Sequence, residues 1–453
     1  MQPRVEPNET SRWRYPIFCD TKMSALNTIL VPLHKLLAWR PGGYLRASGA
    51  LFGWLVVRTL AQTTLFILVA RALGAEGYGA LISVMALAGI FSFAAMGASA
   101  VLVREGAREP HRLPRLTCDM VRLWLGYMPI LCVAAVIVTE LLVGHLLPTP
   151  AILAIVIAEV VCATAVDGVG RSYQSRDRVS TMGLVSSGLI VTRLAAFVII
   201  GRIVQWTPTT WAFGYLASSA GYLLLLLLLA SNSNHRRVMD SDTPLGKAIK
   251  ASLPFSFSYA AQKVQAEINK PMLARISDAS GAGVLSAAQR FTDLLLLPVL
   301  AMLETLALRV YRAPKPISTT FTLGLAPLAT AVLGGGVLFA AAKTIPWILG
   351  PSFQASVSAV VLLAALPAVQ VFRWLLSTAM TGLDLHRYFF LVHGVGAVTN
   401  VFLVAALAPA FGLSGAVWAA YLTEAVLIVI QGAILLRNNR GAKSPSRFAR
   451  SMS

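Results

Sequence analysis

Long hydrophobic stretches separated by short polar segments run through most of the chain. A helix needs about 20 apolar residues to cross the hydrocarbon core of a bilayer, and these stretches have about that length. Their apolar residues do not alternate with polar ones, as they would in barrel strands. The pattern predicts twelve transmembrane helices, at residues 48–70, 80–102, 123–143, 151–169, 183–203, 211–230, 252–273, 283–308, 321–341, 356–376, 389–407 and 413–436.

Composition agrees with a membrane protein. Hydrophobic residues make up 57% of the 453 positions and charged residues 13%, and the mean hydropathy is +0.71. A soluble domain could not bury that much apolar surface, so a soluble fold is excluded. Because lipid offers the backbone no hydrogen-bond partners, long apolar segments must be helical, and we predict an all-α integral membrane protein.

One long polar interval divides the twelve predicted helices into six and six. Apolar residues between positions 26 and 37 recur at helical spacing, which fits a helix in the membrane interface, although Pro32 interrupts it and a disordered tail fits equally well. The predicted organisation is an N-terminal tail at 1–47, a bundle at 48–230, a linker at 231–251, a second bundle at 252–436 and a basic tail at 437–453.

A short pattern occurs twice, 204 positions apart: residues 70–81 (ARALGAEGYGAL) correspond to residues 274–285 (ARISDASGAGVL). Each copy lies between two predicted membrane helices. Duplicated helix bundles are typical of secondary transporters, whose binding sites lie near the bilayer midplane between the repeats. We therefore predict two six-helix bundles around a central cavity.

Lys and Arg are unevenly distributed between the two sides of the membrane. Of 38 such residues, 28 fall in the two tails and in the loops on one side, and only Arg71, Arg202, Arg275 and Lys343 lie in the opposite loops. Cytoplasmic loops carry the excess of cations, so both termini are predicted to be cytoplasmic. The net charge of +19 thus reflects topology and attraction to anionic lipids, and no nucleic-acid partner is expected.

Six cations lie within the predicted helices. A charge at the bilayer centre costs about 2.5–3.5 kcal/mol even on lenient scales, so these residues indicate a hydrated interior. Arg58 lies about 15 Å deep, and the repeat offset places it beside Lys263. For Arg373, close to a predicted cytoplasmic helix end, we expect snorkelling to the interface. The residues predicted to bind a negatively charged substrate are Arg58, Lys263, Lys270 and Arg290.

Two carboxylates in these helices are candidates for ion coupling. A buried carboxylate can carry a proton or hold Na⁺, which makes Glu267 and Asp293 the leading groups for coupling to H⁺ or Na⁺. The alternative is permanent pairing with nearby cations, because Lys263 precedes Glu267 by four residues and Arg290 precedes Asp293 by three. The residues alone leave both interpretations open.

Patterns typical of catalysis do not occur in the sequence. It contains no Walker-type phosphate loop, no metal-spaced His or Cys cluster and no Gly-x-Ser-x-Gly turn. The four cysteines indicate neither a disulfide framework nor a metal site. We expect no enzymatic activity and no cofactor, and the energy for transport would come from an ion gradient, the membrane potential or the substrate gradient.

Several short motifs resemble one transporter family, and the similarity covers nearly all of residues 48–436. The family is the polysaccharide biosynthesis branch of the multidrug/oligosaccharidyl-lipid/polysaccharide exporter superfamily, which contains the O-antigen and exopolysaccharide flippases. The motifs are LGxxxYG at 73–79, VRE at 103–105 and AR at 107–108 in the first half, and INKPML at 268–273, GAG at 281–283 and SAAQR at 286–290 in the second.

The resemblance implies a function that physical patterns do not. Members of this family have twelve to fourteen helices in two bundles and move a polyprenyl-diphosphate-linked oligosaccharide across the bacterial inner membrane by alternating access. The cations at Arg58, Lys263, Lys270 and Arg290 would then contact the diphosphate or acidic sugars. A polysaccharide polymerase and export machinery are expected partners. Members often carry Asp where this chain has Asn269, which weakens the case for ion coupling at that position.

Two other functions remain open from the sequence. A multidrug exporter of the same superfamily would favour cationic substrates, which an excess of intramembrane cations disfavours. A membrane glycan polymerase or ligase tends to have a large outer loop, whereas the predicted outer loops here are short, as at residues 144–150 and 409–412. A purely structural partner in a polysaccharide complex is a third interpretation.

Overall fold

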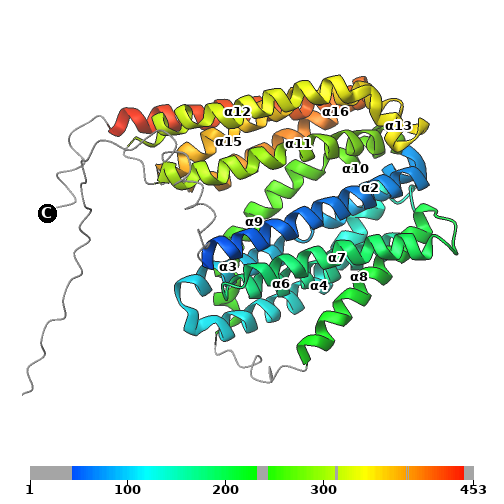
Figure 1. The fold of residues 1–453 in the computed structure, drawn as a ribbon, viewed down its shortest axis with the longest axis horizontal. Helices are drawn as coiled ribbons and strands as arrows, with labels where there is room; N and C mark the ends of the chain where they lie inside the picture. Colours follow the sequence, from blue (N-terminus) through cyan, green and yellow to red (C-terminus); the bar gives the residue numbers. More distant parts are fainter. Residues whose placement is uncertain (1–42, 232–242, 312–314, 384, 386, 443–453) are drawn as a thin grey trace, which may run out of the picture. The chain divides into compact units, whose positions relative to one another are not determined.

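The computed structural model describes residues 43–231, 243–311, 315–383, 385 and 387–442, and these residues contain helices and no β-strand (Figure 1). The predicted interfacial helix in the N-terminal tail lies outside them. The helices, labelled as in Figure 1, are α2 (Gly43–Ile90), α3 (Phe93–Arg108), η1 (Pro110–Arg112), α4 (Leu113–Val143), α5 (Thr149–Val156), the π-helix η2 (Ile157–Ala163), α6 (Thr164–Gln174), α7 (Val179–Ile200), α8 (Pro208–Ser231), α9 (Leu245–Glu267), α10 (Asn269–Ile276), α11 (Ala279–Tyr311), α12 (Pro316–Ala341), η3 (Ala342–Thr344), α13 (Ile345–Leu349), η4 (Pro351–Phe353), α14 (Ser356–Leu363), α15 (Leu366–Gly382) and α16 (Arg387–Ala442).

Within the described residues, nine helices are long and apolar enough to cross a membrane, compared with twelve predicted stretches. The protein is therefore an all-α membrane protein, as predicted. The nine are Gly53–Ile90, Pro110–Val143, Thr149–Gln174, Val179–Ile200, Pro208–Leu229, Ala279–Leu303, Pro316–Leu349, Ser356–Gly382 and Leu391–Asn438.

Two sharp bends at glycine account for part of the difference. The backbone of Gly74 has φ 69° and that of Gly412 has φ 54°, so each interrupts a longer helical segment, α2 and α16 respectively. An L-residue is strained at these positive φ angles, whereas glycine adopts them readily. Each bend separates two of the predicted stretches, 48–70 from 80–102 and 389–407 from 413–436.

The seventh predicted stretch, 252–273, is not among the nine apolar helices. It corresponds to most of α9 and most of α10, which are separated at Ile268. Three charged residues, Lys263, Glu267 and Lys270, reduce its hydropathy. Its crossing of the membrane stays a prediction.

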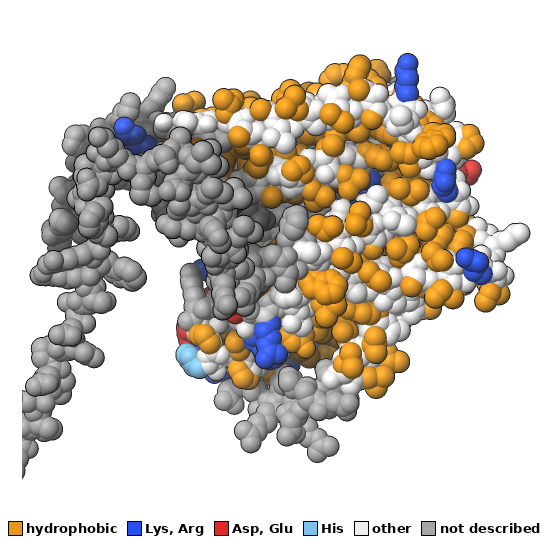
Figure 2. All heavy atoms as spheres, viewed as in Figure 1, with side chains coloured by type: hydrophobic (Ala, Val, Ile, Leu, Met, Phe, Trp, Pro, Cys, Tyr) orange, Lys and Arg blue, Asp and Glu red, His pale blue; other side chains and the backbone are white. Residues whose placement is uncertain are grey.

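The described residues from Ala50 onward form one unit, in which the two predicted halves contact each other. Figure 1 shows α4, α6, α7 and α8 grouped together, and α11, α12, α15 and α16 grouped together. Helix α3 packs along α9, which connects the halves. The face shown in Figure 2 is mostly hydrophobic between its two ends, and the visible Lys and Arg side chains lie mainly near those ends, as expected for a lipid-facing surface.

The two copies of the repeated pattern contact each other through glycine. A Cβ added to Gly79 would lie 1.6 Å from the carbonyl oxygen of Ala279, and one added to Gly283 would lie 2.1 Å from the carbonyl oxygen of Ala75. Both glycines and both alanines are related by the same 204-residue offset. The repeats therefore meet reciprocally, with a backbone approach that only glycine permits.

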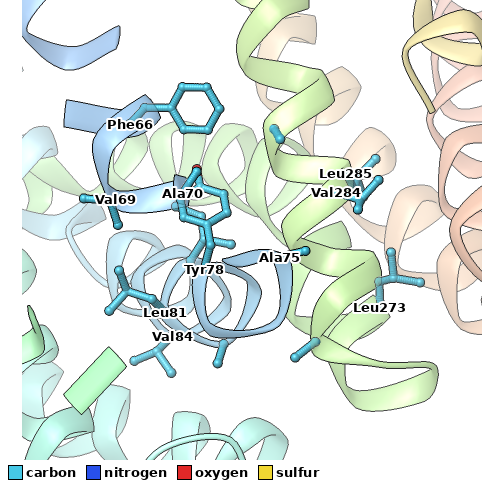
Figure 3. Close-up of a cluster of buried hydrophobic side chains, with 14 of the residues drawn as sticks. Phe66, Val69, Ala70, Ala75, Tyr78, Leu81, Val84, Leu273, Val284 and Leu285 are labelled. Atoms are coloured by element: carbon cyan, nitrogen blue, oxygen red, sulfur yellow. The ribbon is translucent and has the colours of Figure 1, made fainter. Parts of the chain in front are cut away.

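Apolar side chains surround this glycine contact. Phe66, Tyr78 and Leu81 of α2 and Val284 and Leu285 of α11, all labelled in Figure 3, belong to one cluster of buried apolar side chains. The Phe66 ring also packs edge-on against Phe291 of α11, with centroids 6.0 Å apart. A buried apolar cluster thus holds the two copies together at the end of the bundle opposite the predicted cytoplasmic loops.

Alanine substitution at Gly79 tests this contact. We expect Gly79→Ala to lower the thermal unfolding midpoint of the purified protein, because an overpacked contact costs about 1–3 kcal/mol. Gly89→Ala in the same helix is the control: its Cβ would meet nothing within 4 Å, so loss of unfolded-state entropy should leave stability unchanged or higher. Stability of Gly79→Ala equal to that of Gly89→Ala would contradict the close approach.

Candidate functional site

A polar cavity of about 370 Å³ lies between the two halves. Three of the four predicted substrate-binding residues line it: Arg58 from α2, Lys263 from α9 and Arg290 from α11. Each comes from a different helix, and they are separated by more than 200 positions between the halves. The structure therefore brings these cations together, as the repeat offset suggested for Arg58 and Lys263.

None of these three cations forms an ion pair with a carboxylate in the part of the chain that the structure describes. In particular, the expected alternatives of pairing Lys263 with Glu267 and Arg290 with Asp293 are not observed. The Arg58 side chain is exposed, and Lys263 and Arg290 are partly so. Their charges are available to a ligand in the cavity.

The fourth predicted residue, Lys270, lies elsewhere. Its side chain is buried, it donates a hydrogen bond and an ion pair to Glu267, and it does not line the cavity. Glu267 does line the cavity from its other side. Lys270 is therefore in position to orient this carboxylate and to offset its charge, and a direct substrate contact through Lys270 would require a different arrangement of α9 and α10.

Asp293, the second predicted coupling residue, lines a smaller neighbouring cavity of about 110 Å³. This space lies between α2 and α11 and shares Gln62 and Arg290 with the central cavity. Asp293 is exposed. The two coupling candidates thus line different cavities, which have Arg290 in common.

A buried charged cluster in the first half was not among the predicted site residues. Glu159, in the π-helix η2, accepts a hydrogen bond from Tyr215 and pairs with Arg193 at 3.3 Å. Arg193 also donates to Ser219 at 3.0 Å, and its guanidinium lies 3.9 Å from the centroid of the Tyr215 ring. Glu159, Arg193 and Tyr215 line the central cavity. The only sequence signal for them is two opposite charges in neighbouring predicted helices.

The second half has a neutral polar cluster instead. The side chain of Asn400 donates to Asn269 at 2.7 Å and to the carbonyl of Gln265 at 2.9 Å, and accepts from Thr423 at 3.4 Å. Asn269, Asn400 and Thr423 are buried. Because amides and a hydroxyl take the place of carboxylates, this cluster carries no formal charge.

The expectation that Arg373 snorkels to the interface is wrong. Its side chain is buried and forms a hydrogen-bonded ion pair with Glu424 of α16. The bent helix α16 places a carboxylate beside α15, and pairing replaces the hydration that snorkelling would have supplied. Since the partners are 51 positions apart, local spacing could not reveal this contact.

A double-mutant comparison tests the Arg373–Glu424 pair. Removing one partner leaves a buried charge alone, so we expect Arg373→Leu to reduce stability by about 3–5 kcal/mol. The double variant Arg373→Leu/Glu424→Leu should recover most of that loss, measured as the thermal unfolding midpoint of the purified protein. A double variant as unstable as the single one would show that the charges do not interact.

Groups of His, Cys, Asp and Glu that could hold a metal ion do not occur among the described residues. Cys132 and Cys162 are free thiols. Charged and hydrogen-bonding side chains line the central cavity, among them Arg58, Lys263 and Arg290.

Comparison with known proteins identifies the same class by independent means. Residues 45–308 match the family described as "Polysaccharide biosynthesis protein". No curated protein matches the chain in sequence.

Solved structures share the fold at low sequence identity. An inward-facing multidrug resistance MATE family transporter of the MOP superfamily has a TM-score of 0.64 and 15% identity, with 86% of this chain and 96% of that chain covered. The lipid II flippase MurJ in an inward closed conformation has a TM-score of 0.63 and 11% identity, with 85% and 86% covered. A MOP superfamily transporter from Pyrococcus furiosus, for which a reverse polarity of the binding pocket is reported, has a TM-score of 0.50 and 14% identity, with 86% and 93% covered.

Proposed function

We propose that this chain, which belongs to the polysaccharide biosynthesis protein family, is a flippase for a polyprenyl-diphosphate-linked oligosaccharide. It would move the lipid-linked sugar from the cytoplasmic to the periplasmic leaflet of a bacterial inner membrane, for surface polysaccharide or exopolysaccharide. The proposed topology has twelve membrane crossings, with both termini in the cytoplasm. The fold that it shares with a lipid II flippase supports a lipid-linked substrate.

The observation that carries the proposal is the charge of the central cavity. Each carboxylate that lines it has a cationic partner: Glu159 pairs with Arg193, Asp167 with Arg171, and Glu267 with Lys270. The cations at Arg58, Lys263 and Arg290 have no such partner among the described residues. The charge left available to a ligand is therefore positive, which suits a diphosphate.

This arrangement addresses the physical difficulty of flipping. A charged, hydrated head group crosses hydrocarbon slowly because it loses its water, and fixed cations in a polar cavity replace that lost hydration. No covalent bond is made or broken. The protein lowers a barrier to movement, in keeping with a family of transporters and not of enzymes.

A lipid-linked substrate also needs space for its tail. On one seam between the halves, Gly97 of α3 lies so close to α9 that an added Cβ would be 2.7 Å from the Ser256 nitrogen. On the other seam, α2 and α11 leave the smaller cavity beside Arg290. This asymmetry supports a model in which the head group occupies the central cavity while the prenyl chain leaves between α2 and α11 into lipid.

A multidrug exporter is the second candidate, because the fold matches a MATE transporter as well as it matches MurJ. The reported reverse polarity of the binding pocket in the Pyrococcus furiosus protein suggests that cavity charge is a useful discriminator within this fold. Unpaired cations disfavour a cationic drug, so we favour the flippase.

Charge reversal in the cavity tests the proposed function. We expect Arg58→Glu and Lys263→Glu each to reduce translocation of a fluorescent polyprenyl-diphosphate oligosaccharide at least about tenfold, since each replaces an attraction to phosphate with repulsion. The measurement is made in liposomes containing equal amounts of reconstituted protein. Arg176→Glu, an exposed site between α6 and α7, is the matched control and should transport normally.

Wild-type translocation by both Arg58→Glu and Lys263→Glu would refute the central site. Extrusion of a cationic dye by the wild-type protein, without movement of the lipid-linked sugar, would favour the multidrug exporter.

Ion coupling through Glu267 makes a separate prediction. If this carboxylate binds the coupling ion, Glu267→Gln should lose any acceleration of translocation by an H⁺ or Na⁺ gradient while exchange without a gradient continues. The same assay, with and without each gradient, provides the measurement. An unchanged gradient response in Glu267→Gln would transfer the role to Asp293 or another group, to be checked with Asp293→Asn.

A further inference from the structure

A second pocket, of about 390 Å³, lies between α3, α4 and the start of α9. It is separate from the central cavity: the two share no lining residue. Helix α3 lies between this pocket, which Ala98, Val101 and Leu102 line, and another space lined by Met96, Ala100 and Val103. That other space shares Asp167 with the central cavity. The α3–α4–α9 pocket thus lies on the side of α3 away from the substrate site.

The rim of this pocket carries cations from three helices. Arg112 and Arg115 come from η1 and α4, and Lys247 comes from the first turn of α9. Arg115 donates from Nε to the hydroxyl of Thr243 at 2.7 Å, which leaves the two terminal nitrogens of its guanidinium for a ligand. Within the described residues, neither Arg115 nor Lys247 forms an ion pair.

Acidic groups are also present, and they reduce the net charge without removing it. Glu105 and Asp119 line the same pocket. Glu105 already has Arg104 at 3.9 Å, and Arg112 has Glu109 at 3.0 Å. Arg115 and Lys247 therefore supply the cationic groups for an anion at this rim.

The floor of the pocket is apolar. Leu116, Met120 and Leu123 of α4 continue inward from Arg115 along one side of the helix, and Ala248 and Ala251 of α9 lie opposite. The helix Pro110–Val143 is one of those apolar enough to cross the membrane, and its first turns contain the cationic rim. The pocket therefore begins at a membrane boundary and extends about 12 Å toward the hydrocarbon, at about 1.5 Å per residue from Arg115 to Leu123.

From this combination, we infer that the pocket binds an anionic phospholipid of the predicted cytoplasmic leaflet. Arg115 and Lys247 contact the phosphate, and an acyl chain lies on the apolar floor. A soluble phosphate ester would use the rim and leave the floor in contact with water. A basic pocket between membrane helices at the cytoplasmic side is a recognised type of lipid head-group site.

Binding there has a consequence for conformation. The pocket has walls from α3, α4 and α9, beside the contact between Gly97 of α3 and Ser256 of α9. A lipid that contacts α4 and α9 together stabilises the arrangement in which these helices are close, in proportion to its preference for that state. Anionic lipid is thus a ligand for one conformational state of the transporter. This effect does not depend on which sugar the transporter carries.

Lipid binding to the full-length purified protein tests the inference. Native mass spectrometry in detergent, with phosphatidylglycerol titrated against phosphatidylcholine, should show preferential binding of phosphatidylglycerol. We expect Arg115→Gln/Lys247→Gln to raise the dissociation constant for phosphatidylglycerol at least tenfold, which corresponds to about 1.4 kcal/mol. The control Arg176→Gln/Arg178→Gln removes two exposed arginines at the same end of the bundle, outside the pocket, and should bind as the wild type does.

A second variant probes the floor without changing charge. Ala251→Phe fills the apolar part of the pocket and should also weaken the binding of phosphatidylglycerol. This variant still tests the inference if the double variant fails to fold. Equal affinity for phosphatidylglycerol and phosphatidylcholine would overturn the inference. An equal loss of affinity for phosphatidylglycerol in Arg115→Gln/Lys247→Gln and in the control Arg176→Gln/Arg178→Gln would also overturn it. Displacement of the lipid by millimolar inorganic phosphate would reassign the site to a soluble anion. None of these outcomes depends on translocation of a sugar, so failure here is distinguishable from failure of the proposed function.

Discussion

Charged side chains within hydrocarbon must be paired or hydrated, and this constraint accounts for the positions of the intramembrane charges. Arg193, Lys270 and Arg373 are buried, and each has a carboxylate partner. Arg58 and Lys263 have no such partner among the described residues, and they line a cavity. Pairing and hydration are alternative ways to meet the same cost of several kcal/mol per charge.

Some cations of the cavity wall are paired with a carboxylate and others are not, and this difference sets the charge that the cavity presents to a ligand. Counting every charge in its wall would suggest an almost balanced site, with arginine and lysine opposed by Glu159, Asp167 and Glu267. The ion pairs assign each of those carboxylates to a cation. The charge that remains available to a ligand is positive. This unpaired charge, more than the total charge of the wall, favours an anionic head group over a cationic drug.

The duplication links the fold to this site. Gly79 and Gly283, equivalent in the two repeats, allow α2 and α11 to approach at one end of the bundle. Further along the same two helices lie Arg58 and Arg290, on the cavity wall. Two sharp glycine bends, at Gly74 and Gly412, turn long helical segments back through the bundle. Close backbone contact at one end and polar space further in thus come from the same pair of helices.

The sequence by itself indicated the helical membrane class, the family and similar depths for Arg58 and Lys263, which line one cavity in the structure, because hydropathy, short motifs and a repeat offset are properties of order along the chain. It left open whether Glu267 couples an ion or pairs with Lys263, and it misjudged Arg373. Only the tertiary structure decided these contacts and assembled Glu159, Arg193 and Tyr215 into one cluster. The partners in the Glu159 cluster and in the Arg373–Glu424 pair lie tens of residues apart on separate helices. Their pairing depends on distance in space, which helix packing sets.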